Sequence, residues 1–255
     1  MQAMSGKRTE TSKRSGKGDG KLVMVVDSDD YNLHYTSALL KRFEYRVSEA
    51  RSAVEALQRV ETSLPDLLLV EQDLPHMPAL DLLANIRRDP RLQGVPAIVL
   101  AGSDNDAAEA RHLEAGFACR LVAPVGAEEL YRAVQAAIEP TPRGSLRIQT
   151  RLPVQVNNVP LDCVEGECAS VISEHGMYVC TLRPHPANSS VTVRIAVNGR
   201  TIDADAVVLY CHQRGEGPFG EAGMGLRFAQ IAEEDREHLR SYINQQLTKD
   251  ILSRS

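Results

Sequence analysis

The chain has 255 residues and a formal net charge of −5, with 43% apolar and 25% charged residues. This length suffices for two domains with cores of their own, and the composition is that of a globular protein. No run of about 18 apolar residues occurs, so the sequence predicts no membrane-spanning helix. The first 20 residues are polar and lack the apolar segment of a signal peptide. The five cysteines are irregularly spaced, and without a secretion signal we expect reduced thiols and a cytoplasmic location.

Charge is distributed unevenly along the chain. Residues 1–21 carry six Lys/Arg against two acids, a charge of +4, and their polar composition predicts a disordered basic tail over residues 1–20. Residues 22–140 carry 11 Lys/Arg against 19 acids, a charge of −8, and residues 141–255 carry 12 against 13, a charge of −1. An acidic first domain argues against a nucleic-acid partner.

Residues 21–139 show the pattern of an α/β domain. Short aliphatic runs at 22–26, 67–70, 97–100 and 119–122, with a weaker one at 45–48, are typical of strands buried in a parallel sheet. Helical patterns separate them, at 32–43, 53–61, 79–88, 105–115 and 127–138. This alternation predicts a doubly wound parallel five-stranded sheet. In such sheets the functional groups lie at the carboxyl ends of the strands.

Three motifs at those strand ends resemble the receiver domain of bacterial response regulators. They are VVDSDD at 25–30, DLPHMPALDLL at 73–83 and the Ala-Pro pair at 123–124. Their order and spacing fit the family over the whole of residues 21–139. The resemblance implies the strand order 2-1-3-4-5 of that family.

The same resemblance indicates a degenerate phosphorylation site. The family's acceptor aspartate falls on Glu71, and its acidic pair falls on Asp27 and Ser28. The family's switch hydroxyl falls on Ala101, and its lysine falls on Ala123. Mg²⁺ needs several hard oxygen ligands in tight octahedral geometry, which one aspartate and a longer glutamate supply poorly. Without the lysine and the hydroxyl, nothing neutralises or senses a phosphoryl group.

We therefore predict a pseudo-receiver that is not phosphorylated, binds no metal and docks other signalling or motility proteins. The family's aromatic switch residue is replaced by Arg120. Helices over 105–115 and 127–138 would present the docking surface, for a partner or a second copy of the chain. Phosphorylation at Asp29, Asp30 or Asp73 is the disfavoured alternative.

The periodicity changes after residue 140. Strands are predicted at 151–156, 190–197 and 201–210, with an Asn-Gly turn signal between the last two, and an amphipathic helix follows at 233–246. Short strands closed by one helix suggest a small antiparallel β-barrel. We expect a linker over residues 140–150 and the barrel with its helix over residues 151–250.

Three further motifs resemble a PilZ domain. Each motif alone is a weak signal, and their order and spacing together make the resemblance specific. They are an RxxxR motif at Arg143 and Arg147, SEHGMYV at 173–179, and GMGLRF at 223–228 before the helix. The resemblance implies a receptor for the bacterial second messenger cyclic di-GMP. An arginine fork meets guanine O6 and N7 bidentately and grips phosphate oxygens. Ser173 would supply a hydroxyl, and Gly176 a close approach of backbone to ligand.

One departure from the PilZ pattern affects the expected affinity. The family's Asp or Asn falls on Val171, which cannot hydrogen-bond a guanine edge. An unpaired ligand group costs about 1–3 kcal/mol, which weakens binding about five- to a hundredfold. Two alternatives remain open. Val171 packs in a strand and the ligand site has lapsed, or the two arginines belong to a solvated basic linker.

Taken together, the motifs predict a bacterial cyclic di-GMP-responsive signalling adaptor that controls motility or surface behaviour. The alternative is a ligand-independent scaffold in which both sites have lapsed. A phosphorylation-driven regulator is opposed by Glu71, Ala101 and Ala123. We predict no enzyme and no catalytic residues, because neither a P-loop nor a nucleophile elbow is present. The cysteine spacings match no zinc site.

Overall fold

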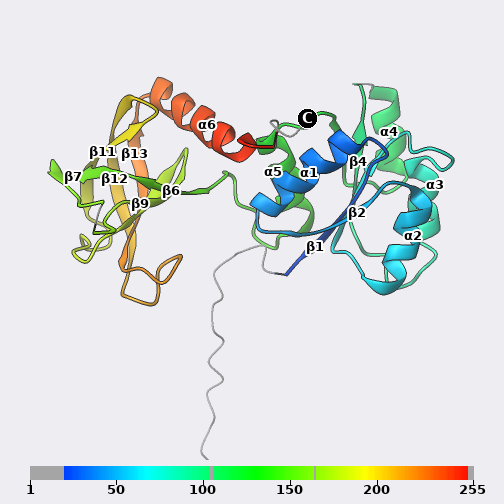
Figure 1. The fold of residues 1–255 in the computed structure, drawn as a ribbon, viewed down its shortest axis with the longest axis horizontal. Coiled ribbons are helices and arrows are strands. Elements are labelled where there is room, and N and C mark those ends of the chain that lie inside the picture. The colour runs from blue at the N-terminus through cyan, green and yellow to red at the C-terminus, as the bar shows by residue number, and fades with distance from the viewer. Residues whose placement is uncertain (1–19, 104–105, 164, 252–255) are drawn as a thin grey trace, which may run out of the picture.

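The computed structural model describes residues 20–103, 106–163 and 165–251 (Figure 1). The predicted disordered tail lies outside the described residues, apart from Gly20. Two lobes are visible, an α/β lobe built by the first half of the chain and a β-rich lobe built by the second. Helix α6 reaches from the β-rich lobe to the other one (Figure 1).

The first lobe contains the predicted five-stranded parallel sheet. Its strands are β1 (Leu22–Val26), β2 (Arg46–Ala50), β3 (Leu67–Glu71), β4 (Ala97–Ala101) and β5 (Cys119–Val122). Their order is β2-β1-β3-β4-β5 and every neighbouring pair is parallel, which confirms the predicted fold class and strand order. The aliphatic residues of β1, β3 and β4 are buried, as helices on both faces of the sheet require.

Four helices connect these strands, and a fifth follows β5. They are α1 (Asp30–Arg42), α2 (Ala53–Thr62), α3 (Ala79–Ile86), α4 (Asp106–Glu114) and α5 (Ala127–Ile138). Side-chain caps set two of the starts, because Asp29 accepts a hydrogen bond from the Asn32 N–H and Ser52 accepts one from the Glu55 N–H. The Asp29 cap explains why α1 begins two residues before its predicted start. Apolar side chains of α1 and α5 cover one face of the sheet, and those of α2 and α3 cover the other.

The second lobe is a curled antiparallel sheet. Its strands are β6 (Ile148–Leu152), β7 (Val154–Val156), β8 (Val159–Pro160), β9 (Ala169–Ser173), β10 (Gly176–Cys180), β11 (Ser190–Val197), β12 (Arg200–His212) and β13 (Gly223–Ile231). Their order is β6-β9-β10-β13-β12-β11-β7-β8, and β6 also lies against β11. The strand predicted over 151–156 is two strands. The chain changes partner at Pro153, from β9 to β11, and a proline cannot donate to either ladder.

Helix α6 (Glu233–Thr248) joins the two lobes. Its apolar face is buried, as predicted from Leu239, Tyr242, Ile243 and Leu247. The Arg42 guanidinium of α1 donates hydrogen bonds to the carbonyls of Gln246, Leu247 and Lys249, at 2.8 Å for Gln246 and 2.5 Å for Lys249. These are carbonyls that a helix end leaves without intrahelical partners.

Packing continues from one lobe into the other. One cluster of buried apolar side chains includes residues of β1, α1 and α5 together with residues of the antiparallel sheet and α6. The lobes are therefore held by packed side chains and by the Arg42 contacts as well as by the connecting segment.

Candidate functional site

Ser28 and Glu71, two positions of the predicted receiver site, meet at the carboxyl edge of the parallel sheet. The Glu71 carboxylate accepts hydrogen bonds from the backbone N–H and the hydroxyl of Ser28, both at 2.7 Å. Asp27 is 1% exposed, and its carboxylate accepts the Asp29 N–H at 2.9 Å. Ser28 thus binds Glu71, the residue predicted to stand at the acceptor position.

The other two positions of this site carry no polar side chain. Ala101 is buried at the end of β4, and Ala123 is half-buried after β5, where the Ala123–Pro124 peptide is cis. Arg120 of β5 donates a hydrogen bond to the Ser103 carbonyl in the segment after β4. Within the described residues, no group of three or more His, Cys, Asp or Glu side chains is placed to hold a metal ion. The Mg²⁺ of the receiver family fits these residues poorly, because Ser28 offers a neutral hydroxyl where the family's pattern has a second carboxylate, and Ala101 and Ala123 offer no polar group.

Asp27 gives this edge a pH dependence. Burial raises the pKa of Asp27 to about 7, with a further contribution from Glu71 and Asp29, while the Asp29 N–H opposes the rise. The folded protein therefore holds this proton more tightly than the unfolded chain, and stability falls as pH rises from about 4 to about 7. Each pKa unit is worth about 1.4 kcal/mol, so the loss is at most about 4 kcal/mol.

We expect Asp27→Asn to be more stable than the wild type at pH 8 and equally stable near pH 4. The asparagine oxygen can still accept the Asp29 N–H, and its side chain has no charge to bury. Thermal unfolding between pH 4 and pH 8 measures this, with Asp30→Asn at an exposed carboxylate as the control. If Asp27→Asn and the wild type differed in stability by the same amount at every pH, the raised pKa of Asp27 would not be the cause.

The two arginines of the RxxxR motif lie where the lobes meet. Leu146 between them is buried, Arg143 is half-buried and Arg147 is exposed. The backbone N–H of Arg143 donates to Gln135 Oε1 of α5 at 3.0 Å. Burial raises the pKa of Tyr131, and the positive charges of the two arginines oppose the rise. The motif therefore rests against the first lobe.

Strand register brings Arg147 next to the second motif. In the antiparallel pair β6–β9, Ile148 faces Ile172 and Gln149 faces Val171. Arg147 immediately precedes β6, and continuation of this register places it beside Ser173. Because side chains alternate along a strand, Arg147, Val171 and Ser173 lie on one face of the sheet, opposite to the buried Ile172. Arg147 of the first motif is thus placed beside Val171 and Ser173 of the second.

The turn that contains the second motif is tightly held. The Ser173 hydroxyl donates to the Gly176 carbonyl at 3.1 Å and accepts the His175 N–H at 3.3 Å. A Cβ on Gly176 would lie 2.1 Å from the Leu226 carbonyl oxygen, so close strand packing requires glycine there. Both residues therefore shape the turn in addition to any contact with a ligand.

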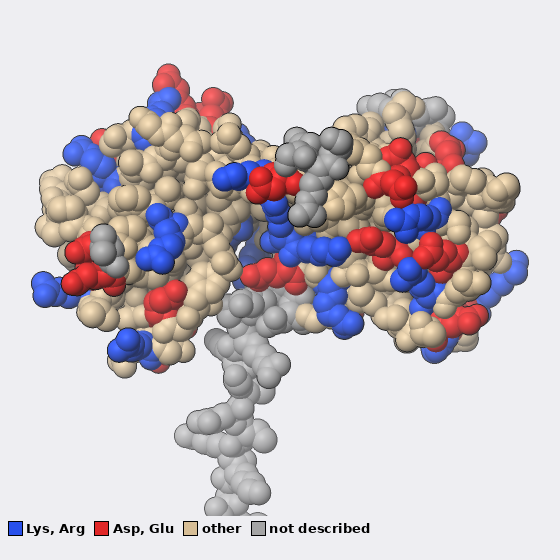
Figure 2. Space-filling model, viewed as in Figure 1, with Lys and Arg blue, Asp and Glu red and all other residues tan. Residues whose placement is uncertain are grey.

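Two arginines of α6, which the sequence analysis did not single out, bind the same turn. Arg240 binds the Glu174 carboxylate, at 2.6 Å from Nη2 and 2.9 Å from Nε, and Arg236 donates to the Glu174 carbonyl at 2.9 Å. Glu174 is 5% exposed, and Arg240 also lies 4.0 Å from Glu128 of α5. Figure 2 shows basic and acidic side chains gathered at the narrow junction of the lobes. The spacing of these arginines along α6 is typical of a solvated helix face. Their contacts with Glu174 can therefore be recognised only from the fold.

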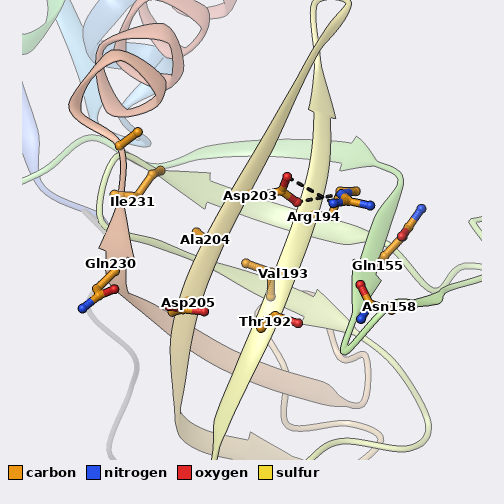
Figure 3. Close-up of a pocket in the computed structure, with 11 residues that line it drawn as sticks. Gln155, Asn158, Thr192, Val193, Arg194, Asp203, Ala204, Asp205, Gln230 and Ile231 are labelled. Carbon is orange, nitrogen blue, oxygen red and sulfur yellow. Dashed lines mark hydrogen bonds and ion pairs between the residues drawn. The ribbon is translucent and has the colours of Figure 1, made fainter.

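A separate groove of about 580 Å³ lies on the outer face of β7, β11, β12 and β13 (Figure 3). Arg194 and Asp203 face each other across two strands, at 2.6 Å between Nε and Oδ1. Asp205 adds a second carboxylate to the lining. None of the four predicted ligand-binding residues lines this groove. With one arginine already paired and two carboxylates, it suits a doubly negative ligand poorly.

Comparison with known families assigns both halves of the chain. Residues 23–135 match the model of the response regulator receiver domain, and residues 141–245 match that of the PilZ domain. The chain carries a receiver domain followed by a PilZ domain. Receiver and PilZ domains are regulatory domains rather than catalytic ones, and the PilZ domain is a cyclic di-GMP-binding domain.

Several known proteins are similar to the receiver half. An uncharacterised 14.6 kDa protein of Leptolyngbya boryana is 32% identical over 113 residues, which are 44% of this chain and 86% of that protein. Response regulator PleD of Caulobacter vibrioides is 25% identical over 114 residues, 45% of this chain but only 25% of PleD. A solved response regulator from Chloroflexus aurantiacus is 28% identical, with a TM-score of 0.46, and the match covers 47% of this chain and 98% of that one. In the described part of this chain, no helix is long and apolar enough to cross a membrane.

Proposed function

We propose that this protein is a bacterial cyclic di-GMP-responsive signalling adaptor of the cytoplasm, with a receiver domain that docks proteins and is not phosphorylated. The main support for cyclic di-GMP as the ligand is the register of β6 and β9, which favours a joint role for Arg147 and Ser173. Arg143 and Arg147 supply a basic surface at the start of the PilZ domain, and the Ser173 hydroxyl lies buried beside it at 6% exposure.

The chemistry of the ligand suits this surface. Cyclic di-GMP has two phosphates and two guanines, and an arginine fork can pair with a phosphate or with guanine O6 and N7. Arg147 is exposed, so its donors are accessible to a ligand. Because Arg143 also contacts α5, binding would change contacts between the two domains. A ligand shifts a domain arrangement only through such differential contacts.

Calorimetric titration of the wild-type protein with cyclic di-GMP tests this function. We expect saturable heat, with guanosine monophosphate as a ligand control that lacks the second nucleotide. A flat trace up to high micromolar cyclic di-GMP would overturn the proposed receptor function.

The receiver half supports an unphosphorylated role. Ser28 and Glu71 bind each other at the position of the family's acidic site, and Ala101 and Ala123 supply neither a hydroxyl nor an ammonium group. Incubation with labelled acetyl phosphate should leave no acyl phosphate on the protein. Stoichiometric labelling would contradict this part of the proposal.

Protein docking is proposed at a groove of about 820 Å³ along β5 and α5, where signalling or motility proteins would bind. Receiver domains commonly dock with other proteins. Small side chains such as Cys119, Ala133 and Ala136 line the groove, and Asn244 of α6 contributes one side of it. Ala136 is exposed, so arginine there would fill the groove without entering the core.

We expect Ala136→Arg to lose the partners that the wild-type protein captures, with unchanged thermal stability. Arg132→Ala serves as the control. It changes an exposed residue of the same groove but leaves the groove open. Sedimentation of both variants distinguishes a second copy of the chain from a different partner. Capture of the same partners by Ala136→Arg would rule out this surface.

A ligand-independent scaffold is the second candidate, and Val171 favours it. Val171 lies in β9 opposite Tyr178 and Gln149, where it presents no hydrogen-bonding group. In that case both domains would act only through protein contacts.

A further inference from the structure

A buried glutamine of the receiver domain holds the first arginine of the ligand motif. Gln135 of α5 is 7% exposed. Its Oε1 accepts the backbone N–H of Arg143 at 3.0 Å, and its Nε2 donates to the Tyr45 hydroxyl at 2.8 Å. The Tyr45 hydroxyl in turn donates to Glu139 at 3.3 Å. Both ends of the amide are therefore engaged, one with the receiver core and one with the PilZ motif.

This network has one consistent orientation. A backbone N–H can only donate, so Oε1 must face Arg143 and the amide nitrogen must face Tyr45. A buried amide that lost either partner would leave a polar group unsatisfied. The backbone at Arg143 is thereby fixed relative to α5, although Arg143 itself belongs to no helix or strand.

A second residue of α5 directs the Arg143 side chain. Tyr131 lies one helical turn before Gln135 and is 7% exposed, with its ring packed edge-on against Phe43 at a centroid distance of 5.2 Å. The positive charge of Arg143 acts on the Tyr131 hydroxyl and opposes the rise in the pKa of Tyr131 that burial causes. One hydroxyl can occupy only one of the five N–H donors of a guanidinium, so the others remain available to a ligand.

We propose that Gln135 and Tyr131 are positioning residues for cyclic di-GMP, through which the receiver domain sets the affinity of the PilZ domain. The inference rests on the proposed function. Ordering a flexible arginine on binding costs affinity, and a clamp held in place beforehand avoids that cost. A protein docked on α5 would then change ligand affinity, and the ligand would change docking by the same factor. This role requires no phosphorylation.

Affinity for cyclic di-GMP in two variants tests the inference. Gln135→Leu keeps the size but removes both hydrogen bonds, and Tyr131→Phe keeps the ring but removes the hydroxyl. We expect each to weaken binding about threefold to tenfold, the loss typical of one hydrogen bond. Tyr31→Phe, at an exposed tyrosine of α1, should bind as the wild type does. Unchanged affinity in both α5 variants, with binding intact in the wild type, would overturn the inference and leave the proposed function standing.

Trypsin separates positioning from a general loss of stability. Without ligand, cleavage after Arg143 should be faster in Gln135→Leu than in the wild type, while cleavage after the exposed Arg214, which precedes a glycine, stays the same. Equal acceleration at both sites would show a global effect and contradict positioning. If the wild type binds no cyclic di-GMP, the proposed function and this inference both fail, whatever the trypsin result at Arg143.

Discussion

Replacing Arg143 and Arg147 together by alanine is expected to abolish saturable binding of cyclic di-GMP. A bidentate arginine contact with guanine is worth about 1–3 kcal/mol, so the loss of two weakens binding by about 30-fold at the least. Arg147 is exposed and forms no part of the core. Arg143→Ala removes only the side chain near Tyr131 and keeps the backbone N–H that binds Gln135. The fold should therefore survive, and calorimetry with a thermal unfolding curve measures both properties.

A change of two charges needs a matched control. Arg183→Ala/Arg214→Ala removes the same charge from exposed positions elsewhere in the PilZ domain. If that variant lost affinity equally, the effect would be long-range electrostatics and the RxxxR motif would not be the site. Undiminished binding in Arg143→Ala/Arg147→Ala would place the ligand elsewhere on the protein.

The receiver fold could be predicted from the sequence because its strands are short, continuous aliphatic runs. In a parallel sheet covered on both faces, such runs are the strands themselves, and β1 and β5 have the predicted bounds. Element ends were less predictable. The Asp29 cap extends α1 towards the N-terminus, and Pro153 divides a predicted strand, because local hydrogen bonding decides where an element ends.

The candidate ligand site was only partly predictable. Motif spacing identified Arg143, Arg147 and Ser173, but no periodicity indicates that the segment beginning at Ile148 pairs with the strand that ends at Ser173. The contribution of α5 was out of reach for the same reason. Gln135 in the sequence is an ordinary helical glutamine, and only the fold brings it against Tyr45 and the backbone of Arg143.

Val171→Asp is expected to tighten cyclic di-GMP binding about five- to a hundredfold. The residue lies on the same face of the sheet as Arg147 and Ser173, where a carboxylate could accept from a guanine that Val171 leaves unpaired, at about 1–3 kcal/mol. Val171 is half-buried, so an aspartate there keeps contact with solvent and the fold should tolerate it.

Two comparisons decide what a gain in affinity would mean. Val171→Asn restores hydrogen bonding without charge, so a gain in both variants assigns the effect to the guanine edge and a gain in the aspartate alone assigns it to the neighbouring arginines. Val159→Asp adds the same charge at an exposed position of β8 and should leave affinity unchanged. If neither substitution at 171 changes affinity while the protein stays folded, the ligand does not reach this face. The scaffold function would then be the better account of why both domains are retained.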